Sequence, residues 1–181
     1  MISDETVIRA GYVLETAHAM LCAARTAPKA CGIDNLTLKA VSGEDLQRLA
    51  EAMREVGRQT GRAFFLRDAD NVAASQAVVL IGTRTVPFGL DCGFCGFPTC
   101  AAKTAGSPAT PCFFNSNDLG LATGSAVSVA ADRRVDNRVM FSAGVAAREA
   151  GMMQGCDTVL AVALSCSGKS IYFDRQPVVQ Q

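Results

Sequence analysis

The feature that most constrains this chain is a long segment without periodicity, residues 84–117, which separates two stretches of regular pattern. Glycine, proline, cysteine and phenylalanine dominate it. A loop of this length inside a compact domain needs a function or an internal staple. The segment contains "DCGFCGFPTC" (91–100) and one more cysteine further on. The groups in this segment that could hold it together are therefore the cysteine thiols.

Four of the chain's eight cysteines lie in this segment, with the spacing C-x2-C-x4-C-x11-C. They are Cys92, Cys95, Cys100 and Cys112. A C-x2-C pair lets two thiolates bind one centre from a single tight turn. Gly93 and Gly96 free the backbone to fold around such a centre and to point N–H groups at sulfur. These four residues are our candidate metal ligands.

Four interpretations of the thiols remain open at this point. A [4Fe-4S] cluster fits four thiolates in one glycine-rich loop. Structural zinc sites usually have two C-x2-C pairs or histidines, and the single histidine, His18, lies far away in sequence. A thioredoxin-type C-x-x-C needs no third or fourth cysteine, and simple core packing is the fourth interpretation. The residues favour the cluster.

Composition narrows the class of protein. Acidic and basic residues balance at 17 each, which gives no indication of a nucleic-acid or acidic-lipid surface. The longest apolar run, "AVVLIG" (77–82), is too short to span a bilayer, and the first residues lack the features of a signal peptide. We expect a cytoplasmic protein with no membrane and no nucleic-acid partner. In that compartment thiols stay reduced, so a disulfide framework is disfavoured.

Around the cysteine segment the hydrophobic pattern predicts one α/β (α+β) domain, residues 1–181, with 84–117 as an irregular insertion. The predicted helices are 5–26, 43–60, 119–134 and 136–150, and the predicted strands are 36–41, 76–83 and 158–165. The segment 60–71 looks irregular. The run 76–83 is apolar throughout, as in a strand buried on both faces.

Smaller patterns complete the expectations. The predicted inner face of the first helix is Val7, Ala10, Leu14, Ala17, Leu21 and Ala24. His18 and Cys22 lie four residues apart, a spacing that can bind metal, but packing is the favoured interpretation. The cysteines without a partner at ligand spacing are read as small buried side chains: Cys31, Cys156 and Cys166. Glycines four residues apart, Gly120 and Gly124, indicate close approach to a neighbouring helix or a flat cofactor.

Several segments resemble known families. "CGFCGFPTCAA" (92–102) resembles the CGxCGxxxC segment of corrinoid iron–sulfur proteins and related electron carriers, which hold a [4Fe-4S] cluster. Together with 64–82, 118–140 and "LSCSGK" (164–169), it resembles the bacterial and archaeal ferredoxin-domain-containing proteins. The resemblance implies a [4Fe-4S] cluster. Cys112 lies somewhat closer to the other cysteines than the fourth ligand usually does in corrinoid proteins.

Residues 23–53 resemble nitroreductases, in which a helix runs into an A-P-S-x-x-N-x-Q segment before a strand. This resemblance implies a nitroreductase-like fold, FMN as a second cofactor and a homodimer. Lys29, Gly32 and Asp34 stand where that family has serine, asparagine and glutamine. Arg25 and Lys29 would face the flavin phosphate or else be solvated.

The sequence therefore predicts a ferredoxin-like [4Fe-4S] redox protein. It would transfer electrons to or from a partner protein, a small-molecule acceptor or a second cofactor. One alternative is a flavin-dependent, nitroreductase-like oxidoreductase that also carries a cluster. Another is a structural zinc module that mediates assembly. We expect a homodimer or higher homo-oligomer, and no catalytic acid, base or nucleophile is identified.

Overall fold

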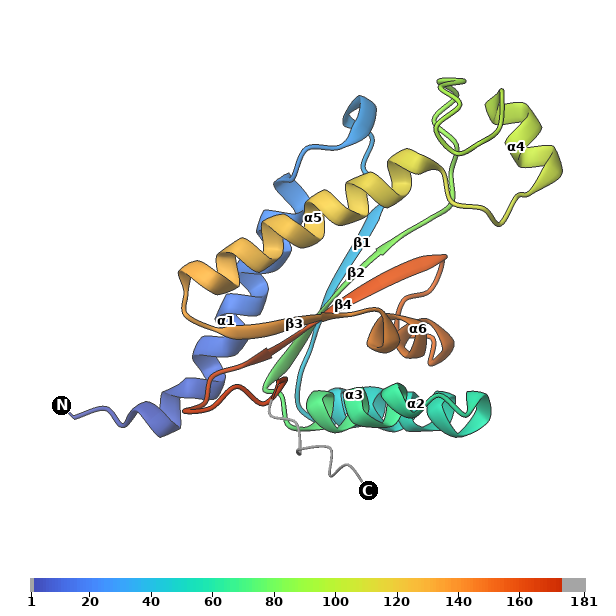
Figure 1. The fold of residues 1–181 in the computed structure, drawn as a ribbon. Coiled ribbons are helices and arrows are strands. Elements are labelled where there is room, and N and C mark those ends of the chain that lie inside the picture. Colours follow the sequence, from blue (N-terminus) through green and yellow to red (C-terminus); the bar gives the residue numbers. More distant parts are fainter. Residues whose placement is uncertain (1, 174–181) are drawn as a thin grey trace.

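A four-stranded antiparallel sheet forms the middle layer of the molecule (Figure 1). The computed structural model describes residues 2–173. In their order across the sheet, the strands are β1 (Leu36–Val41), β2 (Ala77–Thr83), β4 (Thr158–Ser165) and β3 (Asp136–Met140). The two central strands, β2 and β4, are therefore each hydrogen-bonded to a strand on either side, and β1 and β3 are the edge strands.

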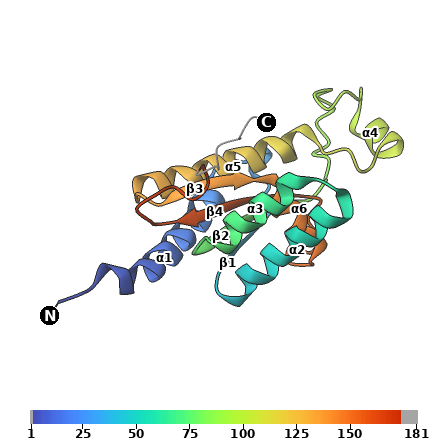
Figure 2. The ribbon, with the colours of Figure 1, turned by 60° about the horizontal axis from the view of Figure 1, so that its bottom comes forward.

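Helices cover both faces of the sheet (Figures 1 and 2). One face packs against α1 (Glu5–Thr26) and α5 (Phe113–Asp132). The other packs against α2 (Glu44–Thr60), α3 (Ala63–Ala73) and α6 (Phe141–Glu149). A short 3₁₀ turn, η1 (Ala30–Gly32), follows α1, and α4 (Cys100–Gly106) lies apart from these layers. The predicted α+β class is confirmed.

Strand β2 explains why two separate cores form. Every residue of β2 is buried, and its side chains alternate between the faces of the sheet. Ala77, Val79 and Ile81 enter the core under α1 and α5. Val78 and Leu80 enter the core under α2, α3 and α6. The prediction of a strand buried on both faces is therefore confirmed.

Helix α6 approaches the sheet unusually closely at Gly144. A Cβ atom at this position would lie 1.9 Å from the carbonyl oxygen of Val159 in β4. Only glycine permits that approach, because a real Cβ atom never comes so near to a backbone oxygen. By contrast, a Cβ atom at Gly120 or Gly124 on α5 would meet nothing within 4 Å, so the predicted close approach at these two glycines does not occur within residues 2–173.

The segment predicted to be irregular contains a helix, α3. The polar run "RDADN" lies within this helix. The buried residues of the helix are Phe65, Asp68, Ala69 and Val72. Asp68 is buried because it accepts a hydrogen bond from Ser142 Oγ at 2.6 Å and pairs with Arg67 at 2.8 Å. A buried but satisfied carboxylate thus interrupts the apolar periodicity that would have indicated the helix.

The segment predicted as one helix from Asp136 to Ala150 is a strand followed by a helix. Residues Asp136–Met140 pair with β4 as an edge strand, and α6 begins only at Phe141. Pairing with a central strand overrides the local helical pattern here, as tertiary context often does. The inner face of α1 is also rotated from the predicted one: Val13, Thr16, Ala17, Met20 and Ala24 are buried, whereas Val7 is 78% exposed.

Within residues 2–173, none of the helices has both the length and the apolar character needed to cross a membrane.

Candidate metal centre

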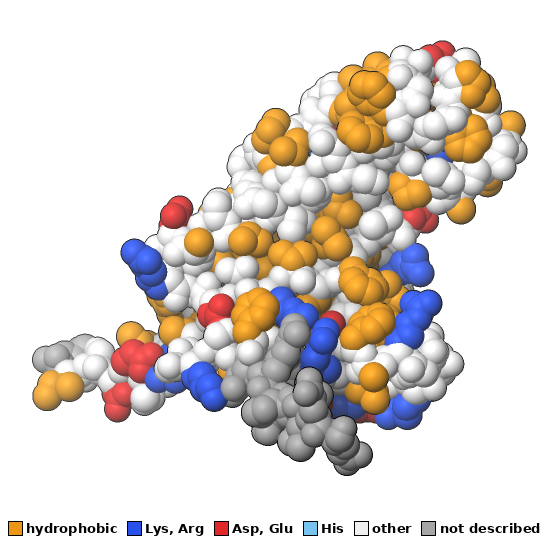
Figure 3. Space-filling model, viewed as in Figure 1, with side chains coloured by type: hydrophobic (Ala, Val, Ile, Leu, Met, Phe, Trp, Pro, Cys, Tyr) orange, Lys and Arg blue, Asp and Glu red, His pale blue; other side chains and the backbone are white. Residues whose placement is uncertain are grey.

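The cysteine-rich segment leaves the sheet at the end of β2 and returns to it through α5 (Figure 1). Between these elements it forms a lobe, residues 84–112, which stands off the three layers and contains only one regular element, α4. Figure 3 shows hydrophobic side chains exposed over this lobe. The lobe carries the first three predicted ligands, and the fourth lies at its junction with α5.

Cys92 directly precedes a tight turn, residues 93–96, and Cys95 lies within it. The N–H of Gly96 donates to the carbonyl oxygen of Gly93 at 2.9 Å, and the two glycines have φ values of +72° and +86°. Side chains are strained at such angles, so these positions favour glycine. The chain thereby reverses between Cys92 and Cys95, which are both half-buried, as the C-x2-C spacing predicted.

Asp91 connects this turn to the third cysteine. Its carboxylate accepts a hydrogen bond from the backbone N–H of Cys100 at 2.6 Å. Cys100 is the first residue of α4, whose N-cap, Thr99, accepts from the N–H of Ala102 at 3.1 Å. The residue before Cys92 is thus bonded to the backbone of Cys100, although nine positions separate them. This contact brings the two cysteine-bearing backbones together.

An aromatic cluster connects the turn to the fourth cysteine. Phe94, between the first two cysteines, contacts Phe113 edge-on with ring centroids 5.2 Å apart, and it lies 6.1 Å from Phe114. These two rings directly follow Cys112, which is buried and is the N-cap residue of α5. Segments separated by some twenty residues in sequence therefore meet at the first turn of α5.

Lys103 stabilises the connection between α4 and Cys112. It is only 2% exposed, and its Nζ atom donates to the carbonyl oxygen of Pro108 at 3.0 Å. A lysine is rarely so deeply buried unless its ammonium group is hydrogen-bonded. The contact closes the lobe over the segment that leads into α5. Sequence reasoning gave Lys103 no role.

The donor set fits an iron–sulfur centre in its chemistry, since four thiols are the ligands that such clusters require. In the described part of the chain, however, no group of three or more Cys, His, Asp or Glu side chains is gathered as a metal site. The backbone contacts bring the cysteine segments together without bringing the sulfurs to one point. The ligand assignment of Cys92, Cys95, Cys100 and Cys112 thus stays a prediction.

One buried polar atom beside Cys112 also fits a sulfur centre. Asn115, on the first turn of α5, is 1% exposed, and its Oδ1 atom accepts from the N–H of Val86 at 2.9 Å. Its Nδ2 group is buried and has no hydrogen-bond partner among the described residues. A buried donor without an acceptor is uncommon and calls for a specific explanation. The sequence offered no signal for Asn115 beyond its place three residues after Cys112.

The other four cysteines lie apart from the lobe's set. Cys22 and Cys31 are exposed, so the prediction that they fill core space is wrong. For Cys22 the reason is the rotated face of α1, and Cys31 lies on η1 with a φ of +55°. Cys156 is buried as predicted, and Cys166 is half-buried. His18 and Cys22 are both exposed on α1.

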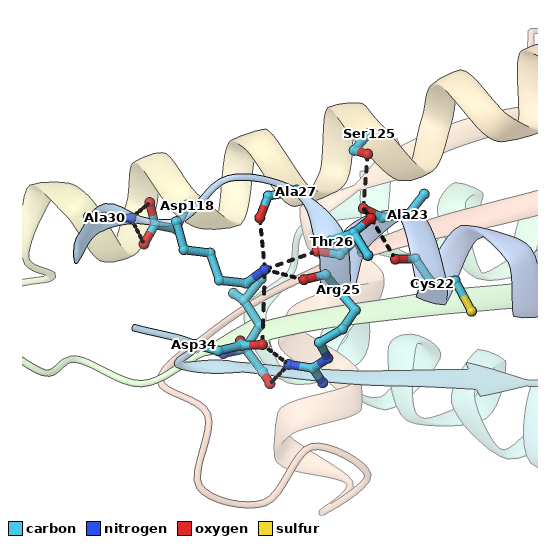
Figure 4. A network of polar contacts seen from close by, with 12 residues as sticks. Cys22, Ala23, Arg25, Thr26, Ala27, Ala30, Asp34, Asp118 and Ser125 are labelled. Atoms are coloured by element: carbon cyan, nitrogen blue, oxygen red, sulfur yellow. Dashed lines mark hydrogen bonds and ion pairs between the residues drawn. The ribbon is translucent and has the colours of Figure 1, made fainter. Parts of the chain in front are cut away.

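The predicted phosphate-facing cations are engaged inside the chain (Figure 4). Arg25 donates to Asp34 at 2.5 Å and to the carbonyl oxygen of Leu36 at 3.1 Å. The Nζ atom of Lys29 donates to the carbonyl oxygens of Arg25 at 2.5 Å and Ala27 at 2.9 Å. Burial raises the pKa of Asp34, but its hydrogen bonds with Arg25 and Leu36 outweigh burial and hold the pKa below its ordinary value. The ammonium group of Lys29 is therefore held inside the chain, and Arg25 is held by Asp34 through one of its nitrogens.

The same network extends to α5. Both carboxylate oxygens of Asp118 accept from the backbone N–H of Ala30, at 3.1 and 3.2 Å (Figure 4). Asp118 is buried one turn after Asn115. The N-terminal half of α5 therefore holds two loops at once: Asn115 holds the start of the cysteine lobe, and Asp118 holds the turn that follows α1.

Comparison with known proteins gives a family. Residues 108–175 match the family described as "Uncharacterized protein containing a ferredoxin domain (DUF2148)". A protein from Archaeoglobus fulgidus, described as an uncharacterized protein, is 40% identical over 186 residues, covering 98% of this chain and 99% of its own length. The family match begins before Cys112 and therefore leaves out the first three predicted ligands.

Solved structures share the fold. A nitroreductase with bound FMN from Desulfitobacterium hafniense superposes with a TM-score of 0.57 at 13% identity, covering 100% of this chain and 85% of that chain. An NADPH:FMN oxidoreductase from Vibrio harveyi superposes with a TM-score of 0.51 at 8% identity, covering 86% of this chain. This chain spans only 60% of that oxidoreductase's length. At such identities the likeness concerns the fold, and the predicted nitroreductase-like fold is confirmed.

Proposed function

Since the chain belongs to the family of proteins that contain a ferredoxin domain, we propose that it is a [4Fe-4S] electron-transfer protein built on a nitroreductase-like scaffold. Cys92, Cys95, Cys100 and Cys112 would supply the four thiolate ligands. The cluster, when bound, supplies a one-electron reduction and oxidation couple. The protein would pass these electrons to or from a partner protein or a small-molecule acceptor.

The contact between Phe94 and Phe113 is the observation that carries the proposal. It holds the turn with the first two cysteines against the helix that begins after the fourth. The N-terminus of a helix favours negative charge, because its free N–H groups and its dipole stabilise anions. A cluster with four thiolates carries net negative charge, so the start of the 20-residue helix α5 suits it.

The remaining residues of the lobe would orient the ligands and exclude water. Asp91 and Thr99 fix the backbone at Cys100 through the hydrogen bonds described above. The aromatic cluster formed by Phe88, Phe94, Phe113 and Phe114 packs over the junction of the lobe with α5. Solvent exposure and hydrogen bonds to sulfur set the reduction potential of a cluster. These contacts would therefore help to set the reduction potential at which the protein exchanges electrons.

Binding of the cluster would bring the thiols to one centre. Metal binding and folding are coupled wherever a site is incompletely formed without metal. In this lobe the backbone connections are present, but the thiols are not gathered at one point. We therefore propose that loading with iron and sulfide orders residues 91–112.

The exposed apolar side chains of the lobe support docking of a redox partner there. Phe94 is 66% exposed, Leu90 is 47% exposed and Phe113 is 42% exposed, and Figure 3 shows hydrophobic groups on this part of the surface. Electron transfer requires close approach of the donor and the acceptor. A partner that covers these side chains would be brought beside the cysteine turn.

A homodimer is part of the same proposal. Val7 and Ile8 are exposed on α1 at 78% and 56%, and α5 presents Gly120 and Gly124, where nothing else in the described chain approaches within 4 Å. Apolar and small side chains on two neighbouring helices suit close contact with a second copy. Two-fold symmetric dimers are the commonest soluble homo-oligomers.

The shared fold with FMN-binding proteins supports a flavin as the second candidate function. The engagement of Arg25 and Lys29 inside the chain counts against a phosphate site at the segment where the sequence suggested one. A flavin enzyme would therefore have to bind the cofactor elsewhere. Chemical analysis separates the two proposals directly.

The deciding experiment is anaerobic purification followed by an absorption spectrum and analysis of iron, acid-labile sulfide, zinc and flavin. We expect about four irons and four sulfides per chain, with a broad absorbance that bleaches on reduction. Stoichiometric zinc without sulfide would overturn the proposal in favour of the structural zinc module. Stoichiometric FMN alongside the cluster would establish the flavin alternative.

A further inference from the structure

The side chain of Asn115 has a fixed orientation. Its Oδ1 atom is the acceptor for the backbone N–H of Val86 at 2.9 Å. A backbone N–H can only donate, so the amide oxygen and not the amide nitrogen must face Val86. The Nδ2 group consequently does not face Val86. Its two N–H groups can therefore donate only to an acceptor other than Val86.

Nothing in the described chain accepts those N–H bonds. Asn115 is 1% exposed, and its Nδ2 atom is buried without a partner. Of the many side-chain polar groups in residues 2–173, only Asp136 Oδ2 and Ser165 Oγ share this condition, and both of those lie on paired strands elsewhere in the sheet. Buried donors are normally satisfied, so an unsatisfied one calls for a specific explanation.

Cys112 precedes Asn115 by three residues, at the N-cap of α5. Residues three apart on a helix lie one above the other, and Cys112, Asn115 and Asp118 are all buried. Cys112 is the N-cap of the helix, but its side chain makes no capping hydrogen bond. A buried sulfur without a partner and a buried donor without an acceptor thus lie within one turn of each other. A thiolate is a hydrogen-bond acceptor, which the amide nitrogen requires.

We propose that Asn115 Nδ2 donates a hydrogen bond to the thiolate sulfur of Cys112 in the loaded protein and thereby raises the reduction potential of the cluster. This inference rests on the proposed function. Reduction adds one electron, and a donor aimed at sulfur stabilises the more negative state. Asn115 is therefore a tuning residue, and its second hydrogen bond, to Val86, holds it in position.

The bond to Val86 has a further role in this proposal. Val86 follows β2 at the beginning of the lobe, and Asn115 lies at the lobe's end. The amide thus joins the start of the lobe to the first turn of α5, and its donor is left for another acceptor. An aspartate at this position would keep the acceptor for Val86 but lose the donor. A leucine of similar size would lose both.

The test uses the loaded, full-length protein and two variants at this position, Asn115→Leu and Asn115→Asp. The matched controls are Asn117→Leu and Asn117→Asp, since Asn117 is exposed on the same turn of α5. The reduction potential is measured by titration monitored by electron paramagnetic resonance, together with iron and sulfide content. We expect both Asn115 variants to shift to a more negative potential than their Asn117 controls, with iron content retained.

The neutral variant is decisive, because the added charge of aspartate would itself lower the potential. If Asn115→Leu has the potential of Asn117→Leu while both hold iron, Asn115 does not donate to the centre and the inference fails. A buried water would then be the partner of Nδ2. If the wild-type protein holds no iron or sulfide, the proposed function fails first.

A second measurement does not depend on the variants folding. In wild-type protein labelled with ¹⁵N only in asparagine side chains, electron–nuclear double resonance of the reduced cluster should detect a coupled ¹⁵N and an exchangeable proton. Absence of both signals in a sample with full iron content would overturn the proposal.

Discussion

The ring of Phe94 packs edge-on against the ring of Phe113, with 5.2 Å between centroids and 76° between planes. One of these residues sits inside the C-x2-C turn, and the other is the first residue of α5. A single aromatic contact thus links the beginning and the end of the predicted ligand set. The first prediction below depends on this link.

Removing the ring of Phe94 should loosen the lobe without unfolding the protein. Phe94→Ala deletes an edge-on contact of the kind worth about 0.5–1.5 kcal/mol, but the side chain is 66% exposed and adds little to the core. We expect faster amide hydrogen exchange across residues 91–106 and an unchanged melting temperature. Phe173→Ala, which removes an equally exposed ring outside the lobe, should leave exchange in the lobe as in the wild type.

The eight cysteines should divide into ligands and bystanders. Cys95→Ser should abolish or degrade the cluster, because one of its thiolate anchors is lost and the lobe's order depends on the bound centre. Cys22→Ser is the matched control, since Cys22 is exposed on α1 and has no role in the lobe. Iron and sulfide per chain are measured for both. Loss of iron in Cys22→Ser but not in Cys95→Ser would contradict the ligand assignment.

Cys112→Ser tests the fourth position separately. We expect loss of the cluster there too, although serine is itself a suitable N-cap residue and the helix should survive. Circular dichroism checks the helix content while iron analysis checks the site. An intact cluster in this variant would require another cysteine, such as Cys31 or Cys156, or an exogenous ligand to complete the site.

The close approach of α6 to β4 makes Gly144 a sensitive position. Gly144→Ala places a methyl group 1.9 Å from the Val159 carbonyl oxygen, so backbone must move and we expect a loss of about 3 kcal/mol in the free energy of unfolding. Gly124→Ala on α5 meets no atom of its own chain, so in the monomer it should gain about 0.5–1 kcal/mol from helix propensity. Urea unfolding measures both. Equal stabilities for the two variants would mean that α6 lies further from the sheet.

The Arg25–Asp34 pair should contribute stability that depends on pH. The pKa of Asp34 is lowered below its ordinary value of 3.8, so the folded state favours the ionised form. Its contribution is present above the unfolded pKa near 3.8 and is lost as the pH falls through the lower, folded value. Because both side chains are partly exposed, the effect at pH 7 should be below about 1 kcal/mol.

Asp34→Asn is the variant that checks this dependence. Its free energy of unfolding should lie below that of the wild type at pH 7, and the difference should shrink towards pH 3. The exposed Asp132→Asn should show neither effect. A difference that grows on acidification would have the wrong sign for a carboxylate with a lowered pKa.

Assembly can be tested with the same preparations. We expect light scattering to report a mass of two or more chains of 18.9 kDa. Ile8→Glu introduces a charge on the exposed apolar face of α1 and should shift the mass towards the monomer. The exposed Leu66 on α3 offers a control, Leu66→Glu, away from α1. A monomeric wild type at working concentration would exclude the predicted homo-oligomer.

Elements with strong periodicity or continuous apolar runs were predictable from the sequence. The helix α2 buries Leu46, Leu49, Met53 and Val56, the face that its periodicity predicts. Helix α3 was missed because Asp68 occupies an inner position, where Ser142 of α6 and Arg67 satisfy its carboxylate. Strand β3 was missed because its pairing with β4 is a tertiary effect. A local sequence pattern shows neither the distant contacts of a buried polar side chain nor the pairing partner of a strand.

The candidate site shows the same division. The C-x2-C turn and its glycines followed from spacing alone, since the requirement for positive φ is local. The contributions of Asp91, Lys103 and Asn115 did not, because each depends on a backbone group elsewhere in the lobe. The engagement of Arg25 and Lys29 was equally hidden, since it requires the turn after α1 to fold back onto the helix end.

The position of the lobe has a consequence for how such a protein can arise and diversify. The chain leaves at the end of β2 and re-enters at α5, and α4 has no extensive packing against the helices and strands described around the sheet. Both cores therefore close without it. An ancestral scaffold could acquire residues 84–112 as a cassette, and a descendant could lose or lengthen it, without any change in the buried residues of the sheet.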